Sequence, residues 1–424
     1  MCDTFAVGPS VTKDGTTIFA KNSDREPDEA HIVTLAPRAE HRAGETLRCT
    51  YIEIPQARRT HAVVLAKPAW IWGAEMGVNE KGVVIGNEAL FMKQKPERTP
   101  GLIGMDLVRL GLERASSARQ ACEVIVDLLA RYGQGGACGY RDKSFVYMNS
   151  FLVADRGELL VLETIGRDYA VRPARDHAVI SNAPSIASNW ELSSLRPGTD
   201  LVKARDPLVT FFAGSARRKA LNEQGIRRAW GRFTVETAFA LLRSHAPGRP
   251  WPGFNADVCM HAADPLIRRS QTTGSLVVEL HPQDRFRIFV TATSAPCLSP
   301  FKPFLPAAPY EEASRAGAVY TPGSFWWEHE VLHLSAMLRP HTFRESITRE
   351  VEALEGSWTG EYPAHGWDEA TDDLVRVSHG AFEEAKKARS RWVSRLEGVK
   401  ACPFGMRGFY LRRVARRNRV PLRV

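Results

Sequence analysis

The chain has 424 residues, of which 44% are apolar and 25% are charged, and its formal net charge is +9. This length and apolar content provide for one large core or for two domains. No stretch approaches the roughly 18 consecutive apolar residues of a membrane helix, so the sequence excludes a membrane-spanning protein.

The first predicted elements are two strands, over residues 5–9 and 16–21, which form a hairpin. Asp14–Gly15 between them is a strong turn signal. Folding the chain about this turn lays residues 22–25 beside Cys2. The hairpin therefore predicts a cluster of polar side chains next to the second residue of the chain.

Cys2 is the candidate nucleophile. Its side chain is small, so Met1 is removable, and the exposed α-amine would have a reference pKa of about 7.7–8.0. A thiol and a free amine on one residue form a nucleophile that holds its own base. Lys21 or Arg25 would favour the thiolate, and Asp24 would orient the amine. Taken alone, a Met-Cys start and a charged strand end are more often ordinary features of a cytosolic protein.

Strands, a pair of helices and further strands are predicted next. The first strands cover residues 47–55, 62–65, 69–77 and 82–87, the helices cover 102–114 and 117–132, and the later strands cover 145–154, 158–164, 169–172 and 178–181. Pro100 precedes the first helix, Ser117 begins a capping box, and Gly133 ends the second helix. This order favours an α+β layered domain over a parallel βαβ fold.

The rest of the chain is predicted to be mainly helical. Residues 184–260 are helical or irregular, with 235–242 as the clearest helix, and one hairpin covers 274–281 and 285–293. Helices are then expected over 325–338, 343–354 and 381–396. We interpret residues 306–424 as a helical extension on the preceding domain, where it would cover the site or make an oligomer contact.

Seven short motifs in fixed order resemble the secernin family and its bacterial dipeptidase relatives, which are C69-type cysteine peptidases. They lie at residues 1–4, 21–25, 51–56, 72–77, 79–80, 86–89 and 104–107. The resemblance is dense over about residues 2–305. It implies an N-terminal nucleophile hydrolase, akin to bile-salt and penicillin V amidases, with a four-layer αββα sandwich over 2–305.

The resemblance also implies two oxyanion donors. Asn87 and Asn182, each at a predicted strand end, would flank the carbonyl that Cys2 attacks. A side-chain amide suits this role, because it donates a hydrogen bond without carrying a titratable proton. Without the resemblance, either asparagine would be an ordinary strand-end or turn residue.

Basic residues are the remaining site candidates. In the amidase relatives an arginine before the corresponding late strand supports catalysis, and here Arg268 and Arg269 both stand near that place. We take Arg269, together with Arg25, as the substrate-binding residues. Lys21 stands where the more distant relatives have arginine, so the bidentate contact of a guanidinium is given up.

A rival site lies at His329, Glu330 and His333, which form an H-E-x-x-H motif inside a predicted helix. Two histidines four residues apart share a helix face and can bind zinc, with the glutamate as general base. Glu352 lies near the spacing of a third ligand. Zinc there would leave the N-terminal residues without a role, so we treat a zinc peptidase as the weaker alternative and expect no metal.

The cysteines and the basic end of the chain are interpreted as structural. The cysteines at 2, 49, 122, 138, 259, 297 and 402 are odd in number and lack C-x-x-C spacing, which indicates reduced thiols, inert apart from Cys2. Residues 407–423 carry seven arginines, which we interpret as a frayed basic end and not as a nucleic-acid or membrane-surface site. No signal peptide precedes Cys2, so we expect a cytoplasmic protein.

The predicted function is a cysteine-type dipeptidase that needs no cofactor. Its partner would be a small peptide or amide substrate, and a homo-oligomer is compatible with the helical extension. An N-acyl amide hydrolase of the penicillin V or bile-salt type is the near alternative. A non-catalytic, secernin-like interaction protein is the alternative from another class. The sequence does not identify the dipeptide or amide.

Overall fold

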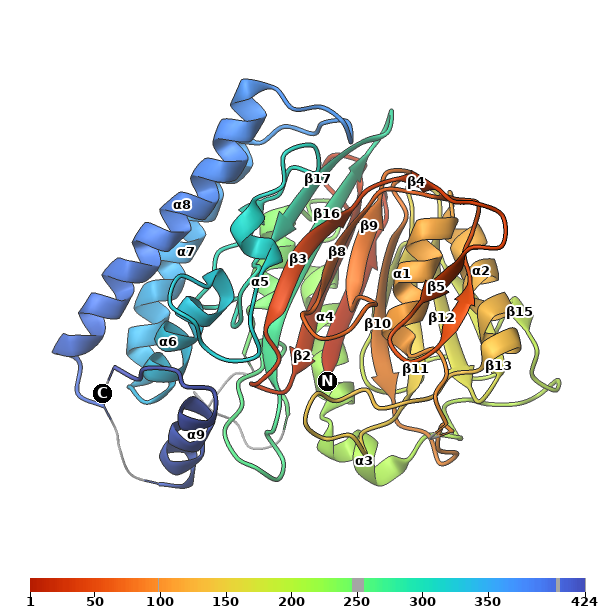
Figure 1. Ribbon diagram of the computed structural model, residues 1–424, viewed down its shortest axis with the longest axis horizontal. Helices are drawn as coiled ribbons and strands as arrows, with labels where there is room; N and C mark the ends of the chain where they lie inside the picture. Colours follow the sequence, from red (N-terminus) through yellow and green to blue (C-terminus); the bar gives the residue numbers. More distant parts are fainter. Residues whose placement is uncertain (98, 246–254, 402–404, 424) are drawn as a thin grey trace.

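Two antiparallel sheets stack face to face in the computed structural model, and helices cover both outer sides (Figure 1). The structure describes residues 1–97, 99–245, 255–401 and 405–423. Phe19 of the first sheet and Val64 of the second belong to one buried cluster between the sheets. A four-layer sandwich follows from this stacking.

The first sheet holds the N-terminal strand near its middle, in the order β14-β1-β2-β16-β17-β18. Its strands are β1 (Cys2–Val7), β2 (Thr17–Arg25), β14 (His177–Ile180), β16 (Gln271–His281), β17 (Arg285–Val290) and β18 (Lys302–Pro303). β1 and β2 are buried along their whole length. Since both faces are covered, even the polar residues at their ends lie inside the protein.

The second sheet follows the order β15-β13-β12-β11-β10-β9-β8-β3. Its strands are β3 (His31–Ala36), β8 (Val63–Pro68), β9 (Met76–Asn79), β10 (Val84–Leu90), β11 (Met148–Ala154), β12 (Leu159–Ile165), β13 (Asp168–Ala174) and β15 (Leu192–Ser193). Two short ribbons pair β4 (Ala39–Glu40) with β7 (Arg59–Thr60) and β5 (Thr46–Arg48) with β6 (Glu53–Pro55). The strand predicted over 47–55 is therefore a small hairpin.

The predicted meander over 145–181 is divided between the two sheets. β11, β12 and β13 follow one another in the second sheet, whereas β14 crosses over and pairs with β1, placing Ile180 opposite Thr4. A pattern of buried residues identifies a strand but not its partner. The crossing brings the end of β14 close to Cys2.

Helices form the two outer layers. Helices α1 (Gly104–Arg114) and α2 (Ala118–Tyr132) pack on the second sheet, while α4 (Ser215–Arg228) and α5 (Val235–Leu242) pack on the first. The short helix α3 (Pro207–Phe212) precedes α4. Ser117 caps α2 by accepting from the Gln120 nitrogen, and Gly133 ends it with φ at 69°. The α+β class and the αββα order are confirmed.

A helical extension follows β18 and lies to one side of the sandwich, blue in Figure 1. It comprises α6 (Phe325–Met337), α7 (His341–Glu361), α8 (Asp372–Arg395), α9 (Met406–Arg417) and the 3₁₀ turns η1 (Glu311–Ser314) and η2 (Leu396–Gly398). Phe382 of α8 joins the cluster between the sheets. None of the helices in the described ranges is long and apolar enough to cross a membrane.

The expectation of a frayed basic end is wrong. Leu411 and Val414 of α9 pack with Leu334 of α6 in one buried cluster. Arg417 forms two hydrogen bonds with the buried carboxylate of Asp28, of which Nε to Oδ1 measures 2.9 Å. Apolar residues recur among the arginines at helical spacing, so one face of this segment is buried while Arg413 and Arg416 are exposed on the other.

Candidate active site

The N-terminal hairpin forms as predicted, with Cys2 opposite Ser23 and Asp3 opposite Asn22. The Asp24 backbone nitrogen donates to Cys2 Sγ at 3.3 Å, and Sγ lies 3.8 Å from Glu75 Oε2. The Cys2 side chain is buried, with 5% of the residue exposed. The candidate nucleophile therefore lies inside the sandwich.

Charged residues surround the thiol. Lys21 Nζ lies 3.6 Å from Glu88 and 3.9 Å from Glu75, and all three side chains are buried. Burial raises the pKa of the Cys2 thiol to about 12, while the Lys21 ammonium lowers it and the Glu88 carboxylate raises it further. Lys21 is thus positioned as the cation that favours a thiolate.

The nitrogen of Cys2 is held by Asn182, just after β14. Cys2 N donates to Asn182 Oδ1 at 2.9 Å, and the same oxygen accepts from Arg218 Nη2 at 2.7 Å. Asn182 Nδ2 donates to the Ala89 carbonyl at 3.0 Å. The amide thus offers its oxygen to Cys2 and its N–H to the Ala89 carbonyl, and its role as an oxyanion donor stays a prediction.

Arg218 on α4 is a site residue that sequence reasoning missed. Its guanidinium is fully buried and donates from Nη1 to the Cys2 carbonyl at 2.9 Å and to Asp3 Oδ2 at 2.5 Å. In the sequence it lies between Arg217 and Lys219, in a helix with many charged residues. No local signal separates it from these neighbours.

Asp24 donates its backbone N–H to the thiol, whereas its carboxylate makes its contacts with Thr272 and Arg218. Its carbonyl accepts from the Met1 amine at 2.8 Å, and its Oδ1 accepts from Thr272 Oγ1 at 2.6 Å. Burial raises the pKa of the Asp24 carboxyl to about 6, although the Met1 amine and Arg218 lower it. The carboxylate is close to the chain start, as the hairpin predicted.

Arg25 is locked in a buried ion-pair cluster. Nη1 donates to Glu75 Oε1 at 2.7 Å, and Nε and Nη2 donate to Glu29 Oε2 at 2.9 and 2.6 Å. Nη2 also donates to the Cys138 carbonyl at 2.6 Å. Arg25 therefore orients Glu75, which contacts the thiol, and its substrate-binding role stays a prediction.

Asn87 lies on β10 next to Glu88, and adjacent strand residues point to opposite faces. Glu88 accepts from Thr4 of the first sheet, whereas Asn87 Nδ2 donates to Asn149 Oδ1 at 3.1 Å and lies 3.6 Å from Met105 Sδ on α1. The hydrogen bonds of Asn87 thus go to the helix side, and its oxyanion role stays a prediction.

A cavity of about 470 Å³ adjoins Met1 and is mainly apolar. Its lining includes Met1, Glu26, Phe91, Asp142, Phe145, Leu208, Val209, Phe212, Leu266, Ile267 and Arg269. Arg269 is about half exposed there and donates to Asp142 at 3.1 Å. Arg268 is instead buried against Asp257 at 3.0 Å. Of the two candidate arginines, Arg269 faces the cavity.

The H-E-x-x-H residues do not form a zinc peptidase site. His333 Nε2 lies 2.9 Å from His261 Nδ1, and His333 Nδ1 lies 3.1 Å from Glu330 Oε1, so both ring nitrogens are hydrogen bonded. Glu352 lies 3.8 Å from Arg243. Within the described residues, His329 and Glu330 belong to no group of side chains that could hold a metal ion.

Residues 1–203 match the sequence model of peptidase family C69. The C2A mutant of conjugated bile acid hydrolase from Clostridium perfringens is 16% identical, with a TM-score of 0.43 over 68% of this chain and 88% of that one. Penicillin V acylase from Agrobacterium tumefaciens is 15% identical, with a TM-score of 0.44 over 72% and 86%. The match of residues 1–203 to this family model agrees with the resemblance of the N-terminal motifs to C69-type peptidases.

Proposed function

We propose that the protein is a cysteine-type N-terminal nucleophile hydrolase that cleaves dipeptides or related small amides. The observation that carries this proposal is the position of Cys2, whose nitrogen is held by Asn182 while its sulfur lies beside Lys21 and Glu75. The match of residues 1–203 to a peptidase family supports hydrolysis of a C–N bond.

Removal of Met1 would convert the peptide nitrogen of Cys2 into an α-amine. Such an amine has a reference pKa of about 7.7–8.0, so a substantial part of it is neutral near pH 7.5. Asn182 Oδ1 already accepts from this nitrogen and would keep it oriented. The lone pair of the neutral Cys2 amine can take the thiol proton, directly or through one water.

The thiolate then attacks the scissile carbonyl and forms a C–S bond. The ammonium of Cys2 gives its proton to the leaving amine as the C–N bond breaks, which yields a thioester. A water molecule, deprotonated by the same amine, hydrolyses the thioester and restores the thiol. Lys21 and the backbone N–H of Asp24 stabilise the thiolate before it attacks the carbonyl and again when it leaves the thioester.

The cavity at Met1 supports a small substrate with an apolar part. Loss of Met1 would extend this space toward Cys2, with Phe145 and Phe212 in the wall. Arg269 donates to Asp142, and its half-exposed guanidinium has further N–H groups that could pair with a substrate carboxylate. A dipeptide with an apolar side chain offers both features. The apolar wall alone would also receive the acyl group of an N-acyl amide, which is the second candidate.

Intact-mass measurement and a substrate panel test the proposal. We expect a mature chain that lacks Met1 and forms one adduct with a thiol reagent at Cys2. Hydrolysis of dipeptides should be lost in Cys2→Ala. It should be kept in the control Cys122→Ala, since Cys122 is a buried cysteine on α2. An active chain that retains Met1 would exclude the mechanism. Absence of both turnover and adduct would favour the non-catalytic alternative.

Arg269→Ala separates the two substrate classes. If a dipeptide carboxylate pairs with Arg269, the variant should raise KM for dipeptides about tenfold and leave uncharged acyl amides unaffected. Faster turnover of acyl amides than of dipeptides by the wild type would favour the amidase alternative.

A further inference from the structure

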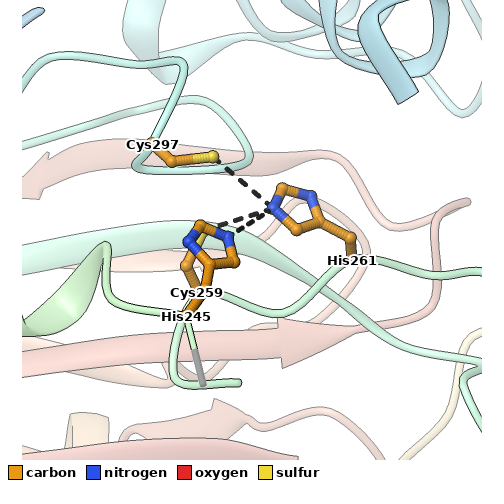
Figure 2. A group of neighbouring side chains, drawn as sticks. All are labelled: His245, Cys259, His261 and Cys297. Atoms are coloured by element: carbon orange, nitrogen blue, oxygen red, sulfur yellow. Dashed lines mark hydrogen bonds between the residues drawn. The ribbon is translucent and has the colours of Figure 1, made fainter. Parts of the chain in front are cut away.

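Two histidines and two cysteines converge on one point away from Cys2. They are His245, Cys259, His261 and Cys297, whose side chains are drawn in Figure 2. His245 follows α5, Cys259 and His261 precede β16, and Cys297 follows β17. Cys259, His261 and Cys297 are buried, and His245 is partly exposed. The thiols of Cys259 and Cys297 are free.

The spacing of these atoms matches that of a tetrahedral metal site. His261 Nε2 lies 3.1 Å from His245 Nε2, 3.6 Å from Cys259 Sγ and 3.5 Å from Cys297 Sγ. One ligand atom from each of the four residues lies within 4.8 Å of the others. With Zn–N near 2.0–2.1 Å and Zn–S near 2.3 Å, tetrahedral zinc separates two nitrogens by roughly 3.3 Å and a nitrogen from a sulfur by roughly 3.6 Å.

A chain of hydrogen bonds fixes the tautomer of His261. Glu330 accepts from His333 Nδ1, so His333 Nε2 presents a lone pair to His261 Nδ1 at 2.9 Å. His261 then carries its proton on Nδ1 and directs the Nε2 lone pair at the other three residues. Gln271 Nε2 and Ser294 Oγ also donate to Glu330, which favours its role as an acceptor. Such support behind a ligand histidine is typical of metal sites.

We propose that His245, Cys259, His261 and Cys297 bind one structural Zn²⁺ ion. Two thiolates and two neutral imidazoles are a ligand set that zinc prefers, and they give a buried site without net charge. Four protein ligands leave no position for a substrate, so this zinc holds the fold and takes no part in hydrolysis. A groove of about 440 Å³, lined by His245 and Cys297, provides a path for the ion.

The site joins segments that contact the N-terminal hairpin of β1 and β2, which carries Cys2. Asn22 of β2 donates to the Leu242 and Val258 carbonyls, which lie close in sequence to the ligands His245 and Cys259. Met260, between two ligands, donates its backbone N–H to Thr272 Oγ1 at 3.0 Å. Thr272 in turn donates to Asp24. Zinc would thus stabilise the layer on which β2 and Asp24 rest.

Metal analysis and cobalt spectroscopy of the full-length protein test the proposal. Protein expressed with added zinc and purified without chelator should hold about one zinc per chain. Replacement by Co²⁺ should produce a thiolate-to-cobalt charge-transfer band in the near ultraviolet and intense visible bands. Chelation should lower the melting temperature, and added Zn²⁺ should restore it.

Matched cysteine variants locate the ion. Cys297→Ser should lose most of the bound zinc and weaken the charge-transfer band, whereas Cys122→Ser on α2 should keep both. If Cys297→Ser does not fold, the cobalt spectrum of the wild type and the reversible effect of chelation on its melting temperature still test whether thiolates bind the metal. Wild-type protein with little zinc and no cobalt–thiolate band would overturn the proposal, as would a Cys259–Cys297 disulfide or full occupancy by iron or copper.

Discussion

At the level of single residues, Arg218 is the main support of the Cys2 backbone. Its guanidinium pairs with the buried Asp3 and also contacts the Cys2 carbonyl and Asn182. Arg218→Met would leave the Asp3 carboxylate buried without its partner. We expect the free energy of unfolding, measured with urea, to fall by about 3–5 kcal/mol.

Arg217→Met is the matched control, since Arg217 precedes Arg218 on α4 and is exposed. It should change the free energy of unfolding by no more than about 0.5 kcal/mol. Equal effects of the two substitutions would contradict the role assigned to the buried ion pair.

Glu88 makes stability depend on pH. Burial raises the pKa of its carboxyl from 4.5 to about 8, although Lys21 lowers it. Because the folded-state pKa is the higher one, the stabilisation is complete below about pH 4.5 and is lost as the pH rises through 8. The contribution of one such proton changes by at most about 1.4 kcal/mol per pH unit.

Glu88→Gln removes this titration. We expect the stability of the variant relative to wild type to increase between about pH 5 and 8, as measured by urea unfolding at several pH values. Glu123→Gln, at an exposed position on α2, should leave the pH dependence unchanged. A difference between Glu88→Gln and wild type that stays constant over this range would rule out the raised pKa.

At the level of secondary-structure elements, α9 is fastened to the N-terminal part of the chain by Arg417. The Asp28 carboxylate receives Arg417 and also lies 2.9 Å from Arg141. Arg417→Ala should weaken the docking of α9 by about 1–2 kcal/mol, because a charge-assisted bond to a buried acceptor is lost. Hydrogen exchange of α9 should become faster.

Arg416→Ala provides the comparison, since Arg416 is the exposed neighbour of Arg417 on the same helix. Exchange in α9 should match wild type in this variant. Unchanged exchange in Arg417→Ala would show that apolar packing alone holds the helix.

At the level of the whole molecule, the extension and the sandwich share one core. Phe382 of α8 is fully buried and belongs to the same apolar cluster as Phe19 and Val64 of the two sheets. Phe382→Ala should reduce the free energy of unfolding by about 3–5 kcal/mol. Circular dichroism and Cys2 reactivity should follow one shifted transition, because both parts unfold together.

Phe409→Ala is the control for this substitution, because the Phe409 side chain is 72% exposed on α9. It should shift the transition little. Two separate transitions in Phe382→Ala, one for each part of the chain, would contradict a shared core.

The sequence predicts those features of the fold that residues close together in the chain determine. The hairpin at Asp14–Gly15 and the boundaries of α2 depend on local turn and cap signals, and the structure shows them. The layer order followed from the order of elements together with the family resemblance. By contrast, the contact of Arg218 with Cys2 joins residues 216 positions apart, and no local pattern records it.

The same distinction applies to the proposed zinc ligands. We expected Cys259 and Cys297 to be inert because their spacing fits no compact zinc motif. The ligands come from four loop positions between His245 and Cys297, and only the folded sheet brings them together. The H-E-x-x-H motif indicated a zinc peptidase site, but its Glu330 and His333 support the proposed ligand His261 through hydrogen bonds.

The position of Met1 has a practical consequence. Its amine donates a hydrogen bond to the Asp24 carbonyl, and Met1 lines the cavity beside the candidate nucleophile. On the mechanism proposed above, a retained Met1 would block the cavity beside Cys2, and the newly made chain would be an inactive precursor that one aminopeptidase cut activates. An affinity tag fused ahead of Met1 would make that blockage permanent.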